Sequence, residues 1–191
     1  MSVQRAKLQL VGTACMFIAS KYEEIYPPDV GEFVYITDDT YNKRQVLRME
    51  HLVLKVLGFD LSGPSANVFL SQMCELSRTE EKTKHLAMVS TPAPSCVTIL
   101  MFSSQFLCEL SLLHGDKFLQ FSPSLMASAS LALARHSLGL SSGEVWSNEL
   151  ASFTGYQLQD FKDCLLALHA VWGTAATSAQ QAINEKYKSS K

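Results

Sequence analysis

Two charged residues lie in strongly apolar stretches of the chain and are the first candidates for chemistry. Lys21 ends the run LQLVGTACMFIASK, and Glu50 lies within the run VLRMEHLVLKVL. Charged side chains lose hydration in apolar surroundings, and this loss is costly unless hydrogen bonds or an opposite charge replace the water. We therefore predict that another protein satisfies these two residues at an interface.

Simpler roles exist for both residues. Lys21 could be an exposed lysine at the end of a helix, where the helix dipole favours a positive charge. Glu50 could pair with Lys43 or Arg44 of its own helix, although side chains six or seven residues apart are placed less well than those four apart. From the residues alone, these alternatives stay open.

Other polar pairs suggest catalysis but have no suitable partner. Glu23 and Glu24 are adjacent, so on a helix they point about 100° apart. Cys164 and His169 are five residues apart, which places them on different faces of a helix and leaves no orienting third group. The cysteines and histidines show no metal-ligand spacing, and no Gly-rich phosphate loop is present. We predict no catalytic residue, no metal site and no cofactor.

Composition narrows the class of protein. The chain has 191 residues and is 47% hydrophobic, enough to bury a core. Its net charge of −2 offers no basic surface for nucleic acid or an anionic membrane. The five cysteines are odd in number and mostly lie in apolar runs, which favours reduced thiols inside a cell. There is no apolar run of membrane-spanning length and no signal-peptide pattern, so we predict a soluble protein.

Hydrophobic periodicity predicts an all-α protein. Apolar residues surround nearly the whole of a helix at 7–22, which is typical of the centre of a bundle. A short helix at 30–36 and a longer one at 40–57 follow, with Thr37, Asp38 and Asp39 as a capping cluster for the longer one. Asp38 and Asp39 lack the further oxygen ligands of a calcium loop.

A turn-rich stretch at residues 59–64 predicts a domain boundary, with domains at 1–61 and 62–191. Ser62 is a possible cap and Pro64 suits the first turn of a new helix. Further helices are expected at 64–74, 79–88, 122–138, 145–153, 158–172 and 175–188.

Residues 89–105 differ from their surroundings. They read VSTPAPSCVTILMFSSQ, with no charge, two prolines and four serines. Removing them would join residue 88 to residue 106 and restore one amphipathic helix, with Leu86, Phe106, Leu107 and Leu110 at i, i+3, i+4 and i+7. The segment begins with valine and ends with glutamine, whose codons allow the terminal letters of an unspliced intron. We predict intron-derived sequence or a gene-model error, and a surface loop within the helix is the alternative.

Residues 7–61, KLQLVGTACMFIASKYEEIYPPDVGEFVYITDDTYNKRQVLRMEHLVLKVLGFDL, closely resemble the cyclin box of A-type cyclins. The later runs LCELSLL at 107–113, FTGY at 153–156 and QQAINEKYK at 180–188 resemble the second box and C-terminal helix of that family. The resemblance implies two tandem cyclin-box-like helical bundles. The first would be incomplete, because residue 1 corresponds to the start of the third of its five helices.

The resemblance implies a regulatory subunit without chemistry of its own, found in the nucleus and cytoplasm. Such a subunit binds a cyclin-dependent kinase, moves the kinase αC helix inward and thereby activates it. Lys21 and Glu50 would bond backbone groups at the start of αC. The residues implied in kinase binding are Ile18, Lys21, Tyr22, Ile36, Glu50, His51, Leu54, Phe59 and Leu61.

The family also docks substrate and inhibitor peptides in a groove. Here Gln9 matches one residue of that groove, but the motif on the first helix of the family is absent, so the groove would be incomplete. Two alternatives remain: an interaction module of the cyclin fold that never activates a kinase, and a truncated product without function.

Overall fold

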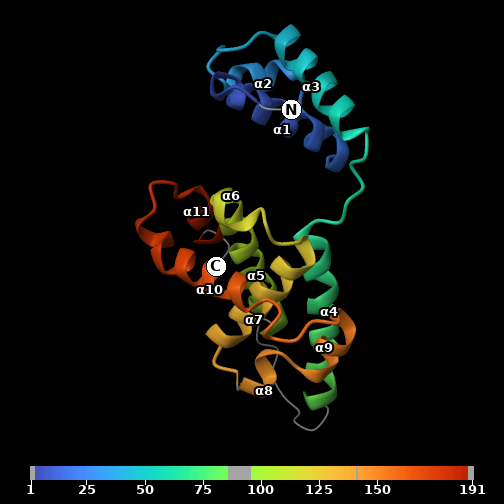
Figure 1. The fold of residues 1–191 in the computed structure, drawn as a ribbon, viewed down its shortest axis with the longest axis vertical. Coiled ribbons are helices and arrows are strands. Elements are labelled where there is room, and N and C mark those ends of the chain that lie inside the picture. Colours follow the sequence, from blue (N-terminus) through green and yellow to red (C-terminus); the bar gives the residue numbers. More distant parts are fainter. Residues whose placement is uncertain (1–2, 86–95, 141, 189–191) are drawn as a thin grey trace. The chain divides into compact units, whose positions relative to one another are not determined.

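The chain divides into two compact units, which a computed structural model describes over residues 3–85, 96–140 and 142–188 (Figure 1). The first unit is Met1–Gly63 and the second is Pro64–Lys191. Every regular element in the described ranges is a helix, so the predicted all-α class is confirmed.

The first unit holds a 3-10 turn, η1 (Arg5–Lys7), and three helices: α1 (Leu8–Glu23), α2 (Val30–Ile36) and α3 (Lys43–Leu57). Both later helices begin with a capping box. Asp29 and Glu32 form the one at α2, and Asn42 and Gln45 form the one at α3. The predicted cap of the third helix at residues 37–39 is therefore wrong, because Asn42 supplies the oxygen that the first turn of α3 needs.

Asp38 and Asp39 instead form the turn after α2. Both have φ of 53°, a left-handed conformation that is unfavourable for most residues but tolerated by aspartate. The Asp38 amide donates to the Tyr35 carbonyl at 2.9 Å, and the Asp39 amide donates to the Val34 carbonyl at 3.3 Å. The two aspartates thus satisfy carbonyls at the end of α2.

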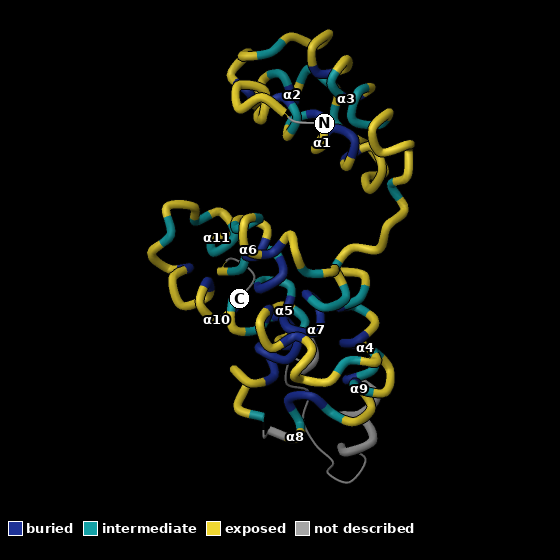
Figure 2. The backbone as a smooth tube through the Cα atoms, in the orientation of Figure 1, coloured by how far each residue is buried: buried dark blue, intermediate teal, exposed yellow. Residues whose placement is uncertain are grey.

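The core of the first unit is small. Its core cluster consists of Leu10, Phe17, Phe33 and Val46, and the rings of Phe17 and Phe33 meet at 5.2 Å between centroids. The opposite face of α1 carries Leu8 and Met16, which are exposed. Figure 2 shows how little of this unit is dark blue, the colour of buried residues.

The second unit is built around α7 (Pro123–Ser137), whose residues 126–135 are all buried. Ser122 caps this helix and Pro123 occupies its first turn, as predicted. Helices α4 (Ala66–His85), α5 (Cys96–Leu112) and α10 (Lys162–Thr174) pack against it. The shorter elements are α6 (Gly115–Phe118), α8 (Ser142–Val145), α9 (Asn148–Thr154), η2 (Ala175–Thr177) and α11 (Ala182–Lys188).

Several predicted boundaries of the second unit are wrong. The separate helices at 64–74 and 79–88 are one helix, α4, up to His85, and residues 86–88 lie outside the described part. Ser62 donates to Asp60 at 3.2 Å, and α4 begins only at Ala66, so neither Ser62 nor Pro64 starts it. The helix predicted at 145–153 is split between α8 and α9, and the one at 175–188 between η2 and α11.

The unusual segment 89–105 is only partly described. Residues 86–95 lie outside the described ranges, while residues 96–105 form the first half of α5. Leu100 and Ser104 are buried, so this half-helix belongs to the core of the second unit. A surface loop is therefore wrong for residues 96–105. The intron origin of the segment stays a prediction.

Candidate protein-binding site

Lys21 and Glu50 are in direct contact within the first unit. Lys21 lies in the last turn of α1 and Glu50 in the middle of α3, and the Lys21 ammonium donates to Glu50 Oε1 as an ion pair. Glu50 is only 7% exposed, while the Lys21 side chain is 42% exposed. Packing of α1 against α3 thus brings together two charges that are 29 residues apart in the sequence.

The simpler pairings of Glu50 are not the ones observed. Lys43 Nζ instead approaches Asp29 Oδ1 at 3.3 Å, and both side chains of that pair are well exposed. The bond from the Gly31 amide, followed by the bond and charge of Lys43, lowers the pKa of Asp29. Lys43 therefore belongs to the capping region of α2 rather than to the Glu50 site.

An aromatic ring also positions the Lys21 ammonium. Nζ lies 4.2 Å from the centroid of Phe17, one turn earlier on α1, which is within the range of a cation–π interaction. Phe17 itself is buried in the core cluster. The cation is therefore held at the rim of the core by a ring on one side and a carboxylate on the other, and the Phe17 contact was not predicted from the sequence.

Three of the apolar residues predicted to bind the kinase beside this pair are at least partly buried. Ile18 is buried, and Leu54 and Leu61 are half-buried. Helix spacing places Ile18 on the Lys21 face of α1 and Leu54 on the Glu50 face of α3, because residues three or four apart are neighbours on a helix. Each charged residue thus has an apolar neighbour on its own helix, Ile18 beside Lys21 and Leu54 beside Glu50.

Four other predicted residues are exposed. Tyr22, Ile36 and Phe59 are 57%, 75% and 67% exposed, and His51 is exposed as well. Tyr22, although it lies in the apolar stretch of α1, is therefore not a core residue of this unit. Phe59 follows Gly58, and both adopt left-handed backbone with φ near 60° at the end of α3. Large apolar side chains in water are typical of a surface that binds a partner.

Sequence reasoning passed over three further exposed apolar residues of this unit. Ile25 and Tyr26 follow α1, and Tyr35 lies on α2 next to Ile36. The sequence signal for Ile25 and Tyr26 was their position outside the periodic part of α1, directly before Pro27. They are candidates for the rim of the same surface.

Gln9, the residue predicted to belong to a peptide-docking groove, lies near the start of α1. Its side-chain oxygen accepts a long hydrogen bond of 3.5 Å from the Tyr41 hydroxyl, and the residue is exposed. Gln9 is therefore accessible, and its docking role stays a prediction.

The pair considered for nucleophilic chemistry is structural. Cys164 is completely buried, and burial, with a smaller effect of Cys108, raises the pKa of its thiol to about 12. Its sulfur lies 3.8 Å from Met126 Sδ, while the His169 ring lies against Trp172. Cys164 therefore remains a protonated core residue at neutral pH.

The described part of the chain lacks two further features. There, no three His, Cys, Asp or Glu side chains gather in a way that would hold a metal ion. Within the same residues, no helix combines the length and apolar character needed to cross a membrane.

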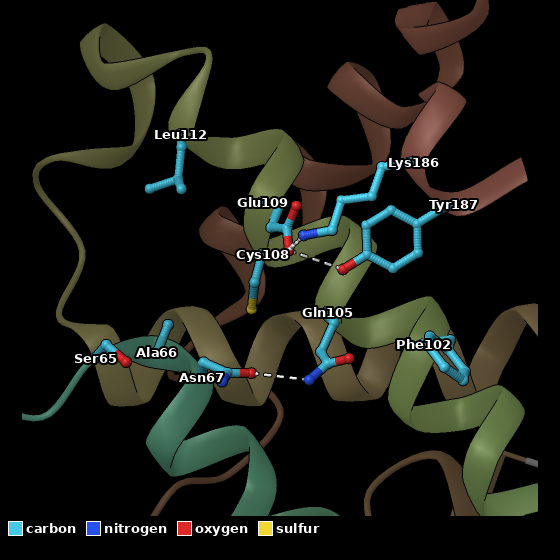
Figure 3. A pocket seen from close by; sticks show the side chains of 10 residues that line it. All are labelled: Ser65, Ala66, Asn67, Phe102, Gln105, Cys108, Glu109, Leu112, Lys186 and Tyr187. Atoms are coloured by element: carbon cyan, nitrogen blue, oxygen red, sulfur yellow. Dashed lines mark hydrogen bonds and ion pairs between the residues drawn. The ribbon is translucent and has the colours of Figure 1, made fainter. Parts of the chain in front are cut away.

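A pocket of about 450 Å³ lies in the second unit, between the first turn of α4, the middle of α5 and α11 (Figure 3). Glu109 joins two of these walls, because it accepts bonds from Lys186 Nζ at 2.7 Å and from the Tyr187 hydroxyl at 3.0 Å. Burial, and then the bond and charge of Glu109, raise the pKa of Tyr187. Gln105 Nε2 donates to Asn67 Oδ1 at 3.1 Å and joins α5 to α4.

Comparisons with known proteins identify the family. Residues 1–62 match the family model described as cyclin, N-terminal domain, and residues 64–191 match the one described as cyclin, C-terminal domain. The chain belongs to the cyclin family. Its sequence relatives are A-type cyclins, as the resemblance in the sequence predicted.

Two relatives show the degree of similarity. This cyclin is 49% identical to Cyclin-A2 of Gallus gallus over 191 residues, which cover 100% of this chain and 43% of the relative. It is 50% identical to Cyclin-A2 of Homo sapiens over 192 residues, covering 100% of this chain and 40% of the relative. The chain thus spans about two fifths of the length of these curated relatives.

A solved structure supports the fold. The X-ray structure of a viral cyclin from herpesvirus saimiri superposes with a TM-score of 0.66, covering 90% of this chain and 68% of that chain. The sequence identity is 15%, so this similarity concerns the fold alone.

Proposed function

We propose that this cyclin is a regulatory subunit that binds and activates a cyclin-dependent serine/threonine kinase in cell-cycle control. Two lines support the proposal. The chain is about half identical to A-type cyclins along its whole length, and one relative, of Patella vulgata, is named G2/mitotic-specific cyclin-A. The first unit also exposes large apolar side chains and carries a charged pair between α1 and α3, and such features are typical of a protein-binding surface.

The Lys21–Glu50 pair is the observation that carries the proposal. A buried carboxylate without a partner would be costly, and Lys21 prevents this before any kinase binds. An ammonium has three donors and a carboxylate has about four acceptor positions, so each group keeps hydrogen-bonding capacity after pairing with the other. Both groups can therefore bond the backbone of an arriving helix without giving up their mutual contact.

We propose that this helix is αC of the kinase. Its first backbone amides and carbonyls would meet Glu50 and Lys21, and an apolar side chain would enter between Ile18, Tyr22 and Leu54. Such contacts form only when αC is turned inward, so binding energy favours that state of the kinase. The inward state seats the αC glutamate against the β3 lysine, an ion pair that phosphoryl transfer requires.

The first test replaces Lys21 by alanine and measures the affinity for a purified cyclin-dependent kinase. We expect a loss of about 2–5 kcal/mol, because buried polar partners are left unpaired. The matched control is Lys43→Ala, which also breaks a lysine–carboxylate pair of the first unit, but an exposed one at the start of α2. Equal affinities of the Lys21→Ala and Lys43→Ala variants would contradict the proposed contact.

Loss of stability must be separated from loss of binding. The Lys21→Ala variant leaves Glu50 alone, so the double variant Lys21→Ala/Glu50→Ala is compared with both single variants. If the pair acts only within this cyclin, the double variant recovers kinase affinity; if both groups contact the kinase, it does not. Far-UV circular dichroism checks that α1 and α3 remain helical.

A second measurement separates an activating cyclin from a module of the same fold that binds without activating. The chain is added to a kinase phosphorylated on its activation loop, and peptide phosphorylation is followed. An activating subunit raises kcat in proportion to complex formation, whereas a binding module forms the complex and leaves kcat unchanged.

A further inference from the structure

The first half of α5, residues 96–105, combines a core position with an unusual surface. Ser104 is completely buried and donates to the Leu100 carbonyl at 2.7 Å, and Leu100 belongs to the core cluster. On the other side of the helix, Ile99 and Phe102 are each 45% exposed. This half-helix fills a necessary place against α7 but turns large apolar side chains to solvent.

A second stretch of the chain has the length and composition to fill the same place. Residues 79–88 read TEEKTKHLAM and lie 17 positions before residues 96–105. Without residues 89–105 they would continue directly into Phe106, and the apolar residues across the junction would have the spacing of one helix face.

Residues 79–88 would suit most of the positions that residues 96–105 now occupy. Ala87 would take the place of the buried Ser104, and both are small residues. Lys82 would take the exposed place of Ile99, where a charged residue is more favourable than an apolar one. The weakest match is Thr83 at the place of Leu100, because it fills less of the core.

We propose that residues 79–88 and residues 96–105 are alternative first halves of α5. A chain with residues 89–105 and a chain without them would share the fold of the second unit. In the longer chain, residues 79–85 belong to α4; in the shorter chain, they would leave α4 and begin α5. Whether residues 89–105 are retained or removed then decides which sequence forms the first half of α5.

The exchange changes one wall of the pocket in the second unit. In the longer chain, Phe102 and Gln105 line this wall, and Gln105 bonds Asn67 (Figure 3). In the shorter chain, His85 and Met88 would stand at these two places. The hydrogen bond from the Gln105 side chain to Asn67 is then lost, and the imidazole of His85 replaces the phenyl ring of Phe102. The two chains would therefore present different pockets on the same fold.

Cross-linking tests which stretch occupies the place beside Asn67. With the Asn67→Cys change, a short bismaleimide should link residue 67 to Gln105→Cys in the longer chain and to Met88→Cys in the shorter one, with the linked peptides mapped by mass spectrometry. In the longer chain, residue 85 lies about 27 Å along α4 from residue 67, so His85→Cys should not link to residue 67 there. A shorter chain in which Met88→Cys fails to link to residue 67 overturns the proposal.

Two deletions test the register. Deletion of residues 89–105 keeps Ala87 in the buried place, whereas deletion of residues 87–105 puts His85 there and Glu81 at the place of Leu100. We expect the first variant to unfold cooperatively with the blue-shifted emission of the buried Trp146, and the second to lose that signal. Loss of the signal in both variants, or its retention in both, overturns the proposal.

Discussion

The two units of this cyclin stabilise themselves to very different degrees. Among the residues that the structure describes, the core cluster of the second unit contains 23 buried residues arranged around α7, whereas that of the first contains four. The first unit leaves Leu8, Met16, Tyr22 and Ile36 in solvent. Small units bury a smaller fraction of their surface and are less stable. The unit that carries the proposed kinase site is therefore the less stable one, and the second unit is the stable scaffold.

The largest expected effect is a loss of stability in the second unit. Leu131 is completely buried in α7, so Leu131→Ala should lower the free energy of unfolding of this unit by about 2–5 kcal/mol. Urea unfolding followed by tryptophan fluorescence reports on this unit, since Trp146 and Trp172 both lie within it. Leu8→Ala, at an exposed position of the first unit, is the control and should leave this transition unchanged. Equal shifts in the two variants would contradict this expectation, because they would show that the loss does not depend on the burial of Leu131.

The next effect uses pH to separate the units. In the second unit, burial raises the pKa of Cys108 to about 11 and that of Cys164 to about 12, from 9.0 for a free thiol. Both thiols bind their protons more tightly in the folded state than in the unfolded state. Their contribution to the stability of the second unit is therefore complete below pH 9 and is lost as pH rises toward 12. We expect the urea midpoint of the tryptophan transition to fall over this range. The variant Cys108→Ala/Cys164→Ala should show a smaller fall from its own midpoint at pH 8.

The first unit should respond on the acid side. The pKa of Asp29 is lowered by the Gly31 amide and by Lys43. Its contribution to the stability of the first unit is therefore present above the ordinary pKa of 3.8 and is lost as pH falls through the lowered value. Asp29→Asn should reduce the acid sensitivity of α2, measured by amide hydrogen exchange. An unchanged acid sensitivity would exclude Asp29 as its source.

The sequence predicted best those features of each unit that depend on interactions between residues close together in the chain. The bounds of α1 and α2 were nearly correct, because the double proline and the apolar periodicity act within a few residues. The contact between Lys21 and Glu50 was not predicted, since it depends on how two helices pack, and the sequence assigned both residues to another protein. The single helix α4 and the helical residues 96–105 were missed because tertiary packing overrides weak local signals there.

The smallest effect compares equivalent helix caps in the two units. Asn42 accepts the Gln45 amide at 3.0 Å at the start of α3, and Ser122 accepts the Leu125 amide at 3.3 Å at the start of α7. Either change to alanine should cost about 0.5–2 kcal/mol of the stability of its own unit. Because the first unit has less stability to lose, Asn42→Ala should raise amide exchange throughout α1 and α3, whereas Ser122→Ala should affect only the first turn of α7. Exchange that stays confined to the first turn of α3 would show that the small core of the first unit suffices to hold this unit together.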